Sequence, residues 1–496
     1  MTKTDTPPPR STYHSGRKPR SAGLIGLTVP TTVLSGVWLI AVLIVSQVVS
    51  FTAALVTALL GVIVVAGMTV RIRDRSALER LWAWGQWQSS RRRGQTFYRA
   101  GRFSRIPGGT PLPGVAAGTK LYEFVDVANR AFAMIHNPHT HQYTVILSAW
   151  PQGDELRDQA QVDQAVWEWS NVLTMMGETS DVDGIVPVID TTPDTGLALL
   201  AEVEAITDPD APRLAREVMW QAAHQATDAQ VRVVPRIAIT FRATTAERKR
   251  DPQEQAVELA RRLPSITDAA ARASVRALPM DAAEVIAFVR RSFDPAAATD
   301  VEVGMRSDDG HGLSWDDGGP VSADERRDRY YHDGAVSVTW EMHLAPRGAV
   351  TERVLARLLA PHPDLPRKRV AVVYRPHTAG DSTKIVDDDY RNAAAAQQSQ
   401  RGLASVQAAM DVDLTRQARD EQAVGHGVSR FGVLITVTSP AAADIPRIDA
   451  LVSDLGIQSR LKIRRCYQFQ AAAFASSLGI GVLLPDHESV PRILAS

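Results

Sequence analysis

Three histidines that lie close together, His136, His139 and His141, form the densest group of metal-type ligands in the sequence. They stand between two short β-type runs, 131–135 and 143–147, and imidazole is a ligand for zinc and copper. In a hairpin, His139 would fall in the turn while His136 and His141 would end opposing strands. Exposed cross-strand neighbours are the competing interpretation, because no cysteine or carboxylate completes the set. We therefore predict no metal and no cofactor.

Other candidate groups have equally simple explanations. Two aspartate pairs, at 308–309 and 316–317, could act as acid and base, but their glycine-rich surroundings are typical of a solvated loop. The single cysteine, Cys466, has no histidine or asparagine motif around it, which favours a packed structural residue. The charged stretch 326–333 is either an interaction surface or a salt-linked end before a strand. No catalytic residue is assigned.

A recognisable nucleotide-hydrolysing site is absent from the sequence. A phosphate loop needs glycines whose amides cradle the phosphates and a lysine directly after the last glycine, and no Gly-Lys pair occurs anywhere. The patterns of dinucleotide binding, serine hydrolases and zinc metalloproteases are missing as well. The formal net charge is +0, so no overall field attracts nucleic acid, and direct nucleic-acid binding is not supported. We predict that the protein is not an enzyme.

The amino-terminal region of the chain contains a long uncharged run. Residues 21–70 contain no Asp, Glu, Lys, Arg or His, and this length fits two membrane crossings of about 20 residues each with a tight turn. Basic residues flank the run at 10–20 and 71–93, which places both flanks in the cytosol. The sequence predicts a disordered basic tail over 1–20 and a transmembrane hairpin over 21–71. The expected localisation is the plasma membrane, multi-pass, with both termini cytosolic.

The segment 72–106 combines arginine with tryptophan and predicts a basic, Trp-rich juxtamembrane helix. Indoles favour the headgroup level, and arginines face anionic lipid. The lipid bilayer is therefore the first predicted partner, and a flank that merely continues the second crossing is the alternative. The predicted membrane-interface residues are Trp82, Trp84, Trp87, Arg91, Arg92 and Arg93.

Beyond this segment, strands and helices mix without strict alternation, which predicts an α+β fold class. The clearest strand pattern covers 232–241, and a helical stripe of apolar residues covers 159–176. Two mixed α/β domains with a long helical excursion are expected to follow the hairpin. The predicted parts are a first cytosolic α/β domain over 120–300, an Asp/Gly-rich loop over 301–330, and a second cytosolic α/β domain over 331–496. The second domain is expected to contain a long helix at 387–424, with a helical hairpin as the alternative.

Three stretches carry a resemblance to a known family: 330–346, 368–376 and 431–484. They include Tyr-Tyr-His-Asp-Gly-Ala-Val-Ser-Val-Thr-Trp, Lys-Arg-Val-Ala-Val-Val-Tyr-Arg-Pro and Leu-Lys-Ile-Arg-Arg. Together with the amino-terminal order, they are similar to an actinobacterial family of membrane proteins carried on integrative conjugative elements. The layout resembles a PrgI-type membrane hairpin joined to the amino-terminal, non-ATPase half of a TrbE/CagE-class type IV secretion ATPase.

This resemblance implies a membrane-anchored structural or docking component of a conjugative type IV secretion (DNA transfer) system, without its own ATPase. The implied partners are a separate TrbE-like secretion ATPase and other secretion-channel subunits, and a homo-oligomer is left open. The missing Gly-Lys pair agrees, since the phosphate loop of that class belongs to the half that is absent here. Two alternatives stay open: an EccE-like subunit of a type VII secretion system, and a membrane-bound enzyme with an unrecognised site.

Overall fold

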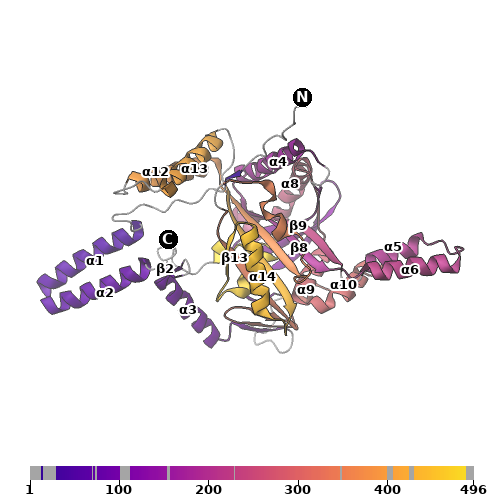
Figure 1. Cartoon of the computed structure of the whole chain (residues 1–496), viewed down its shortest axis with the longest axis horizontal. Helices are drawn as coiled ribbons and strands as arrows, with labels where there is room; N and C mark the ends of the chain where they lie inside the picture. Colours follow the sequence, from indigo (N-terminus) through magenta and orange to yellow (C-terminus); the bar gives the residue numbers. More distant parts are fainter. Residues whose placement is uncertain are drawn as a thin grey trace, which may run out of the picture. The chain divides into compact units, whose positions relative to one another are not determined.

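The computed structural model of the chain forms two compact units (Figure 1). The sheet unit comprises Met1–Ser15, Thr96–Thr378 and Gly427–Asp486. The helical unit comprises Gly16–Gln95, Ala379–His426 and His487–Ser496. The structure describes residues 13–14, 29–69, 71–72, 75–100, 112–153, 157–227, 230–346, 349–398, 406–423 and 429–487.

A single sheet of 13 strands, all paired antiparallel, is the framework of the sheet unit. The strands are β4 (Phe97–Arg99), β5 (Lys120–Val125), β6 (Ala131–Asn137), β7 (Gln142–Pro151), β8 (Val182–Pro193), β9 (Val231–Arg242), β10 (Val275–Pro279), β11 (Ser322–Glu325), β12 (Tyr330–His332), β13 (Ala335–Leu344), β15 (Lys368–Pro376), β16 (Ser429–Pro440) and β17 (Lys462–Arg465). Their spatial order is β4-β11-β12-β13-β16-β15-β8-β9-β7-β6-β5, and β10 pairs with β7 while β17 pairs with β13. A separate two-stranded ladder joins β1 (Tyr13–His14) to β14 (Ala349–Val350).

This connectivity corrects the predicted division into two α/β domains. Val370 of β15 lies opposite Ile189 of β8, so strands expected in the regions 120–300 and 331–496 belong to one sheet. The region 301–330, predicted as a loop, holds the end of helix α10 and strand β11. The physical reason is that a strand can hydrogen-bond at either edge to any strand that the fold brings alongside, and side-chain periodicity does not name that partner.

Local sequence features explain how the first hairpin forms. The predicted β-hairpin around the three histidines is confirmed, and Asn137 at the end of β6 lies opposite Gln142 at the start of β7. The Asn137 side chain accepts a hydrogen bond of 3.1 Å from the His139 amide, which stabilises the turn. His141 adopts a φ of 53°, the left-handed conformation that a tight reversal requires. The turn therefore fixes the register of both strands.

Different helices cover the two faces of the sheet (Figure 1). The first, called the α8 face, packs against α4, α8 and α14. The second, called the α9 face, packs against α9 and α15. The helices are α4 (Gln159–Glu178), α7 (Ala246–Arg250), α8 (Pro252–Arg272), α9 (Ala282–Phe293), α10 (Ala298–Arg306), α11 (Ala356–Leu359), α14 (Ile445–Gln458) and α15 (Gln470–Ser477).

The apolar spacing of the long helix α8 explains why it lies on its face. Leu259, Leu263 and Ile266 recur at helical spacing and are buried against the sheet. Asp251 caps the helix by accepting a hydrogen bond of 2.9 Å from the Gln253 amide, and a proline occupies the first turn. The helix therefore begins at a defined residue and presents one apolar stripe to the strands.

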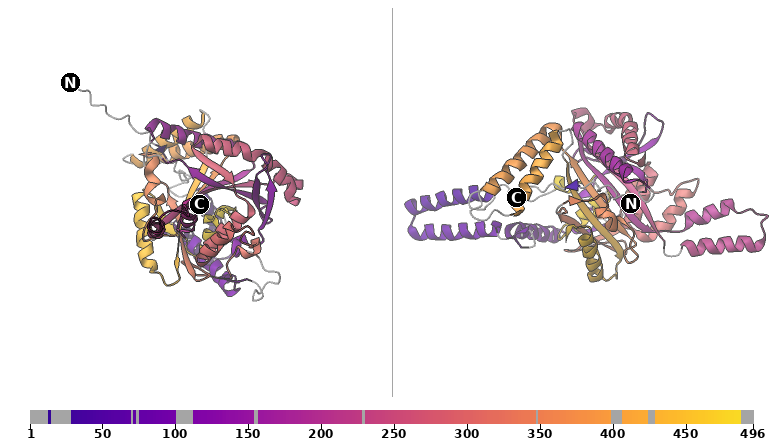
Figure 2. Two further views of the ribbon diagram at one scale, coloured as in Figure 1. Left: turned by 90° about the vertical axis from the view of Figure 1, so that its right-hand side faces the viewer. Right: turned by 45° about the horizontal axis from the view of Figure 1, so that its top comes forward.

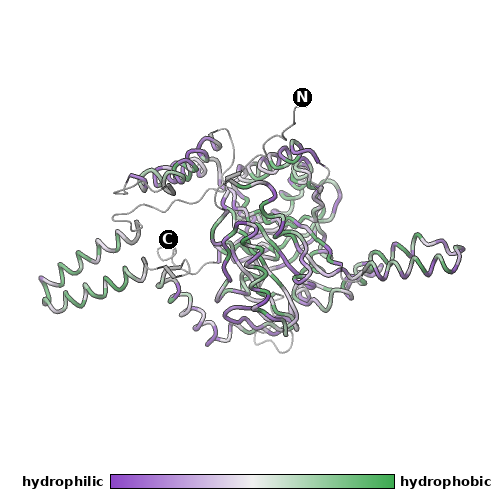
Figure 3. The backbone as a smooth tube through the Cα atoms, in the orientation of Figure 1, coloured by the Kyte–Doolittle hydropathy of each residue, from purple (hydrophilic) through white to green (hydrophobic). Residues whose placement is uncertain are grey.

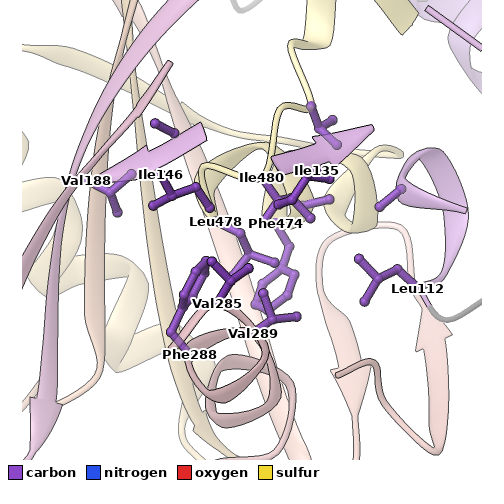
Figure 4. Close-up of a cluster of buried hydrophobic side chains, with 14 of the residues drawn as sticks. Leu112, Ile135, Ile146, Val188, Val285, Phe288, Val289, Phe474, Leu478 and Ile480 are labelled. Carbon is purple, nitrogen blue, oxygen red and sulfur yellow. The ribbon is translucent and has the colours of Figure 1, made fainter. Parts of the chain in front are cut away.

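The α9 face contains its own apolar cluster (Figure 4). Val285, Phe288 and Val289 of α9 meet Phe474 and Leu478 from the carboxyl-terminal part of the sheet unit. Helix α9 is held at its start by a reciprocal capping box between the residues at 281 and 284. Residues almost 200 positions apart in the sequence are thus packed into one core.

Two helices extend from the sheet unit as a pair. In Figures 1 and 2, α5 (Leu197–Ile206) and α6 (Arg213–Thr227) project away from the strands, between β8 and β9 in the sequence. Val203 and Ala223 are the buried residues of these two helices. Most other side chains of the pair are exposed, so this helical hairpin is joined to the core at its base.

The helical unit contains two hairpins of helices. Trp38 connects the first pair, because its indole nitrogen donates a hydrogen bond of 2.7 Å to the Thr57 carbonyl and its ring fills the space beside Gly61. The second pair occupies the region 387–424, predicted as a long helix or a helical hairpin, and two helices form there. The elements are α1 (Val29–Val48), α2 (Phe51–Thr69), β2 (Arg71–Ile72), β3 (Arg75–Ser76), α3 (Ala77–Arg92), α12 (Ala379–Gln398) and α13 (Val406–Ala423).

The transmembrane prediction for this unit is contradicted. Figure 3 colours α1 and α2 largely as hydrophobic, but no helix within the described ranges has both the length and the apolar character needed to cross a bilayer. Two helices do form within the region 21–71, but its prediction as a transmembrane hairpin, the fold class built on it and the multi-pass plasma-membrane localisation are wrong. The prediction rested on the absence of charge, which is a weaker condition than sufficient length and hydropathy.

Candidate functional site

Five arginines and three carboxylates line a cavity of about 100 Å³ in the sheet unit. We call this cavity the arginine pocket. The five positive and three negative side chains leave a formal excess of two positive charges. The charged lining residues are Asp190, Asp194, Arg232, Arg236, Arg291, Glu302, Arg367 and Arg369.

The register of four central strands places the middle of the pocket on the α9 face. Asp190 of β8 lies directly opposite Arg369 of β15, which in turn lies opposite Thr436 of β16. Arg236 of β9 stands opposite Val188, two residues before Asp190 on the same face. Opposed residues have Cβ atoms about 5 Å apart, and diagonal neighbours remain within reach of long side chains. The sheet therefore builds a cross-strand group of opposite charges.

Asp190 is the shared acceptor of this group. Its Oδ2 accepts a hydrogen bond of 3.0 Å from Nε of Arg369 and one of 3.3 Å from Nη1 of Arg236. Arg236 also donates twice to the Leu478 carbonyl at 3.2 Å and lies 4.5 Å from the centre of the Phe288 ring. One carboxylate thus orients two buried guanidinium groups.

Arg369 keeps one donor without a partner. Only 5% of the residue is exposed, and its Nη2 donates a hydrogen bond of 2.7 Å to the Ser292 hydroxyl. Within the part of the chain that the structure describes, its buried Nη1 has no hydrogen-bond partner. Buried polar groups are normally satisfied, so this nitrogen is an unused donor of a residue that lines the cavity.

Burial and charge shift the pKa values of the pocket residues. Burial alone would raise the pKa of Asp190, but the guanidinium groups of Arg369 and Arg236 lower it below its usual value. Burial lowers the pKa of Arg236 to about 10, which still leaves it charged at neutral pH. Burial also lowers the pKa values of Arg291 and Arg367. The pocket therefore concentrates cations that its own carboxylates only partly compensate.

Glu302 at the rim is bound by groups outside this central cluster. Its carboxylate accepts a hydrogen bond of 2.9 Å from Arg306 and another from the Thr195 hydroxyl, while Arg232 lies 3.9 Å away. Arg291 of α9 donates a hydrogen bond of 3.2 Å to the Ala287 carbonyl, and Glu302 is the carboxylate that most favours its charge. A partly buried cation therefore lines the pocket on the side of α9.

Hydroxyl groups continue the polar surface along the α9 face. Thr436, which lines the pocket, is 2.9 Å from the hydroxyls of both Thr339 and Ser477. The neighbouring Thr438 hydroxyl is 2.8 Å from Ser337. These hydroxyls hydrogen-bond to one another and form a polar border beside the pocket.

The α5–α6 hairpin is a second candidate for function. Leu214 and Val218 stand one turn apart on α6 and are 73% and 55% exposed. Ile206 and Met219 are exposed nearby in the same helical pair. Polar residues surround them: Glu204, Arg213, Arg216 and Glu217. An exposed apolar strip with a polar rim is typical of a protein-binding surface.

The predicted histidine group is spread over different environments. His136 is buried and stacks on Tyr143 with ring centres 4.3 Å apart, and burial lowers its pKa to about 4. His139 and His141 are exposed in the turn. No cluster of three or more His, Cys, Asp or Glu with metal-binding geometry is found among the described residues.

The predicted interface residues lie on and just after α3. Trp82 and Trp84 are exposed, whereas Trp87 is half-buried and Arg91 lies 5.5 Å from its ring centre. The three arginines are exposed at the carboxyl-terminal end of the helix: Arg91, Arg92 and Arg93. The structure thus gathers these residues in one helical segment.

The remaining candidates occupy structural positions. Asp317 accepts hydrogen bonds of 3.0 and 2.7 Å from the amide and hydroxyl of Ser314, and these bonds lower its pKa. Cys466 is fully buried beside β13, where its amide donates to the Thr339 carbonyl. Asp328, in the charged stretch, pairs with Arg329 and Arg465 at 2.9 and 3.2 Å. Each group therefore has a local structural task.

Comparison with known proteins adds one match. Residues 20–79 are similar to a family described as a domain of unknown function (DUF8461), and this span covers α1, α2 and the start of α3. No curated protein matches the chain.

Sequence reasoning missed the arginine pocket. Its central residues come from three separate strands, and none belongs to a compact motif. One signal was present: Arg236 and Arg369 each stand within a largely apolar β-type run, at 232–241 and 368–374. A charge in such a run is rarely buried unless it is paired. This pattern predicts that each arginine has a buried acidic partner.

Proposed function

We propose that this chain is a structural docking component of a conjugative type IV secretion machine, and that it has no ATPase activity of its own. The resemblance of three sequence stretches to proteins of conjugative elements supports the machine, and the projecting α5–α6 hairpin supports the docking role. The occupant of the hairpin surface is the separate motor ATPase. The layout implies that the motor is a different polypeptide, since this sequence has no Gly-Lys pair.

The exposed apolar strip of α6 is the observation that carries the proposal. Leu214 and Val218 are exposed to solvent and therefore do not contribute the roughly 1.5–3 kcal/mol of stabilisation that full burial of such a side chain provides. The hairpin buries Val203 and Ala223, whereas Leu214 and Val218 remain more than half exposed. A partner surface that covers the strip would recover this free energy. The charged rim would then select the partner and set its orientation.

Co-purification of the full chain with the secretion ATPase of the same conjugative element tests the proposal. We expect the wild-type chain to retain the ATPase, and the double variant Leu214→Ser, Val218→Ser to lose at least about tenfold in affinity, as interface anchors do. Both side chains are exposed, so the variant should fold normally. Absence of the ATPase from the wild-type preparation would contradict the docking role.

Val257→Ser is the matched control. Val257 is 53% exposed on α8, which is close to the 55% of Val218, but it lies outside the hairpin. This variant should retain the ATPase at the wild-type level. Equal losses in the control and the hairpin variant would show that general surface hydrophobicity, and not the hairpin, holds the two proteins together.

A further inference from the structure

The arginine pocket has the composition of an anion site. Its lining carries five arginines against three carboxylates, and Glu302 is already bound by Arg306 and Thr195. Desolvated cations are costly unless a counter-charge is present, and a fold that gathers several of them needs compensation from elsewhere. A bound anion with about two negative charges supplies that compensation.

The donor geometry favours a tetrahedral oxyanion. Asp190 fixes Arg369 and Arg236 through one shared oxygen, and this contact leaves Nη1 of Arg369 buried and without a partner among the described residues. Guanidinium forks match phosphate oxygens, because two N–H donors of one fork can meet two oxygens of the anion. A cavity needs at least ~10–15 Å³ of such volume to hold one water molecule. The volume of about 100 Å³ is therefore enough for a small polyatomic group.

A wider groove adjoins this pocket and shares part of its wall. The groove has a volume of about 740 Å³, and Pro193, Pro295, Arg367 and Thr438 line both spaces. The remainder is mixed: apolar residues such as Leu451 line it together with Asp333, Asp364, Asp444 and Arg447. Small-molecule sites commonly have volumes of roughly 300–1,000 Å³ with a few polar groups that orient the ligand. The groove can therefore receive an organic body attached to the anion.

We propose that the arginine pocket binds the phosphate group of a small anionic ligand. A phosphate monoester carries about −1.5 to −2 charge near neutral pH, which matches the positive excess of the lining. Its source is either free inorganic phosphate or a phosphomonoester whose organic part lies in the adjoining groove. The site is independent of the docking role, because its residues lie on the α9 face and not on the α5–α6 hairpin.

Calorimetric titration of the full chain at fixed ionic strength tests the site with three probes: inorganic phosphate, adenosine monophosphate and adenosine. Phosphate and the monophosphate should bind, and adenosine should not. Tighter binding of the monophosphate assigns a phosphomonoester as the source, and equal affinities assign free phosphate. Failure of both phosphorylated probes to bind would overturn the proposal.

Two arginines of one strand provide a matched pair of variants. Arg232 at the pocket and Arg242 at the other end of β9 have side chains that are 52% and 55% exposed. Arg232→Gln should weaken phosphate binding about two- to fivefold, whereas Arg242→Gln should leave it unchanged. Equal effects of the two substitutions would show that phosphate binds through nonspecific charge attraction, and this result would overturn the proposal.

Substitution of Arg369 tests the central donor. Arg369→Met should lower phosphate affinity at least about tenfold, and Arg369→Lys should recover only part of it because an ammonium lacks the planar fork. Thermal unfolding of each variant shows whether the fold is retained. If Arg369→Met fails to fold, the half-buried Arg367→Gln replaces it with the same expected direction, and wild-type affinity in that variant would contradict the proposal.

Discussion

The two faces of the central sheet bury different kinds of side chain. On the α8 face, residues such as Phe241 and Leu259 form apolar clusters beneath α4, α8 and α14. On the α9 face, an apolar cluster borders the ionic group of Arg236, Asp190 and Arg369. Apolar burial needs only volume and shape, whereas buried charge needs defined partners. The difference indicates that apolar packing dominates beneath the α8 helices, whereas the α9 face also contains a charged group that depends on specific partners.

The largest expected effect comes from removing the shared acid of the α9 face. Asp190→Asn keeps the size of the side chain but leaves two buried guanidinium groups without their counter-charge. We expect a loss of about 3–5 kcal/mol in the free energy of unfolding, measured by urea denaturation. Asp324→Asn is the control, since Asp324 pairs with the exposed Arg326 at the surface and should cost no more than about 1 kcal/mol. A similar cost for both substitutions would remove the distinction between the faces.

Two buried histidines give the next largest contrast. On the α9 face, His332 hydrogen-bonds through its ring to the Phe293 carbonyl and, at 2.7 Å, to the Ser337 hydroxyl. On the α8 face, both ring nitrogens of His136 are buried without a partner among the described residues, and the ring stacks on Tyr143. We expect His332→Phe to cost about 1–3 kcal/mol and His136→Phe to be neutral or stabilising, measured by urea denaturation at pH 7.

The same pair predicts a response to acid. Burial lowers the pKa of each ring from 6.5 to about 4. The unfolded chain therefore binds more protons than the folded chain between these values, and stability falls as the pH drops through that window. Each phenylalanine variant should show a smaller loss between pH 6.5 and pH 4 than the wild-type chain. Unchanged acid sensitivity in both variants would assign the effect to other groups.

The smallest expected effect concerns a lone cation on the α8 face. Lys368 is fully buried, its ammonium donates a hydrogen bond of 2.6 Å to the Ala360 carbonyl, and burial lowers its pKa from 10.5 to about 8. The unfolded chain binds more protons between these values, so stability should rise as the pH increases from 8 to 10.5. Lys368→Met should reduce this rise, and the exposed Lys249→Met should not. An equal rise in all three proteins would place its origin outside Lys368.

Local elements could be predicted from the sequence because short-range patterns define them. The helix predicted at 159–176 is α4, and the strand predicted at 232–241 is β9 within one residue at each end. The apolar stripe of α4 and the β-branched composition of β9 depend only on neighbouring residues. A proline inside a helical pattern ordinarily predicts that the helix ends just before it, but α8 continues through Pro264 to Arg272. Packing against the sheet outweighs the local cost of the proline.

The pairing of distant strands and the arginine pocket could not be obtained in this way. Asp190, Arg236 and Arg369 contact one another across 46 and 179 residues of chain. Nothing local to any of them specifies which strand becomes its neighbour. The transmembrane prediction failed for a related reason, because an uncharged run constrains composition but does not by itself establish a helix that can cross a bilayer.

The sequence alone determined where many of the helices and strands form, the absence of a Gly-Lys phosphate loop and the presence of two arginines within apolar strand patterns. Those properties follow from residue types and their spacing. Only the tertiary structure decided that the strands join one antiparallel sheet, that α6 projects an exposed apolar strip, and that the two arginines meet one aspartate beside a cavity. The physical reason is that hydrogen-bonded strand edges and buried charges are completed by partners that the fold, and not the local sequence, brings into contact.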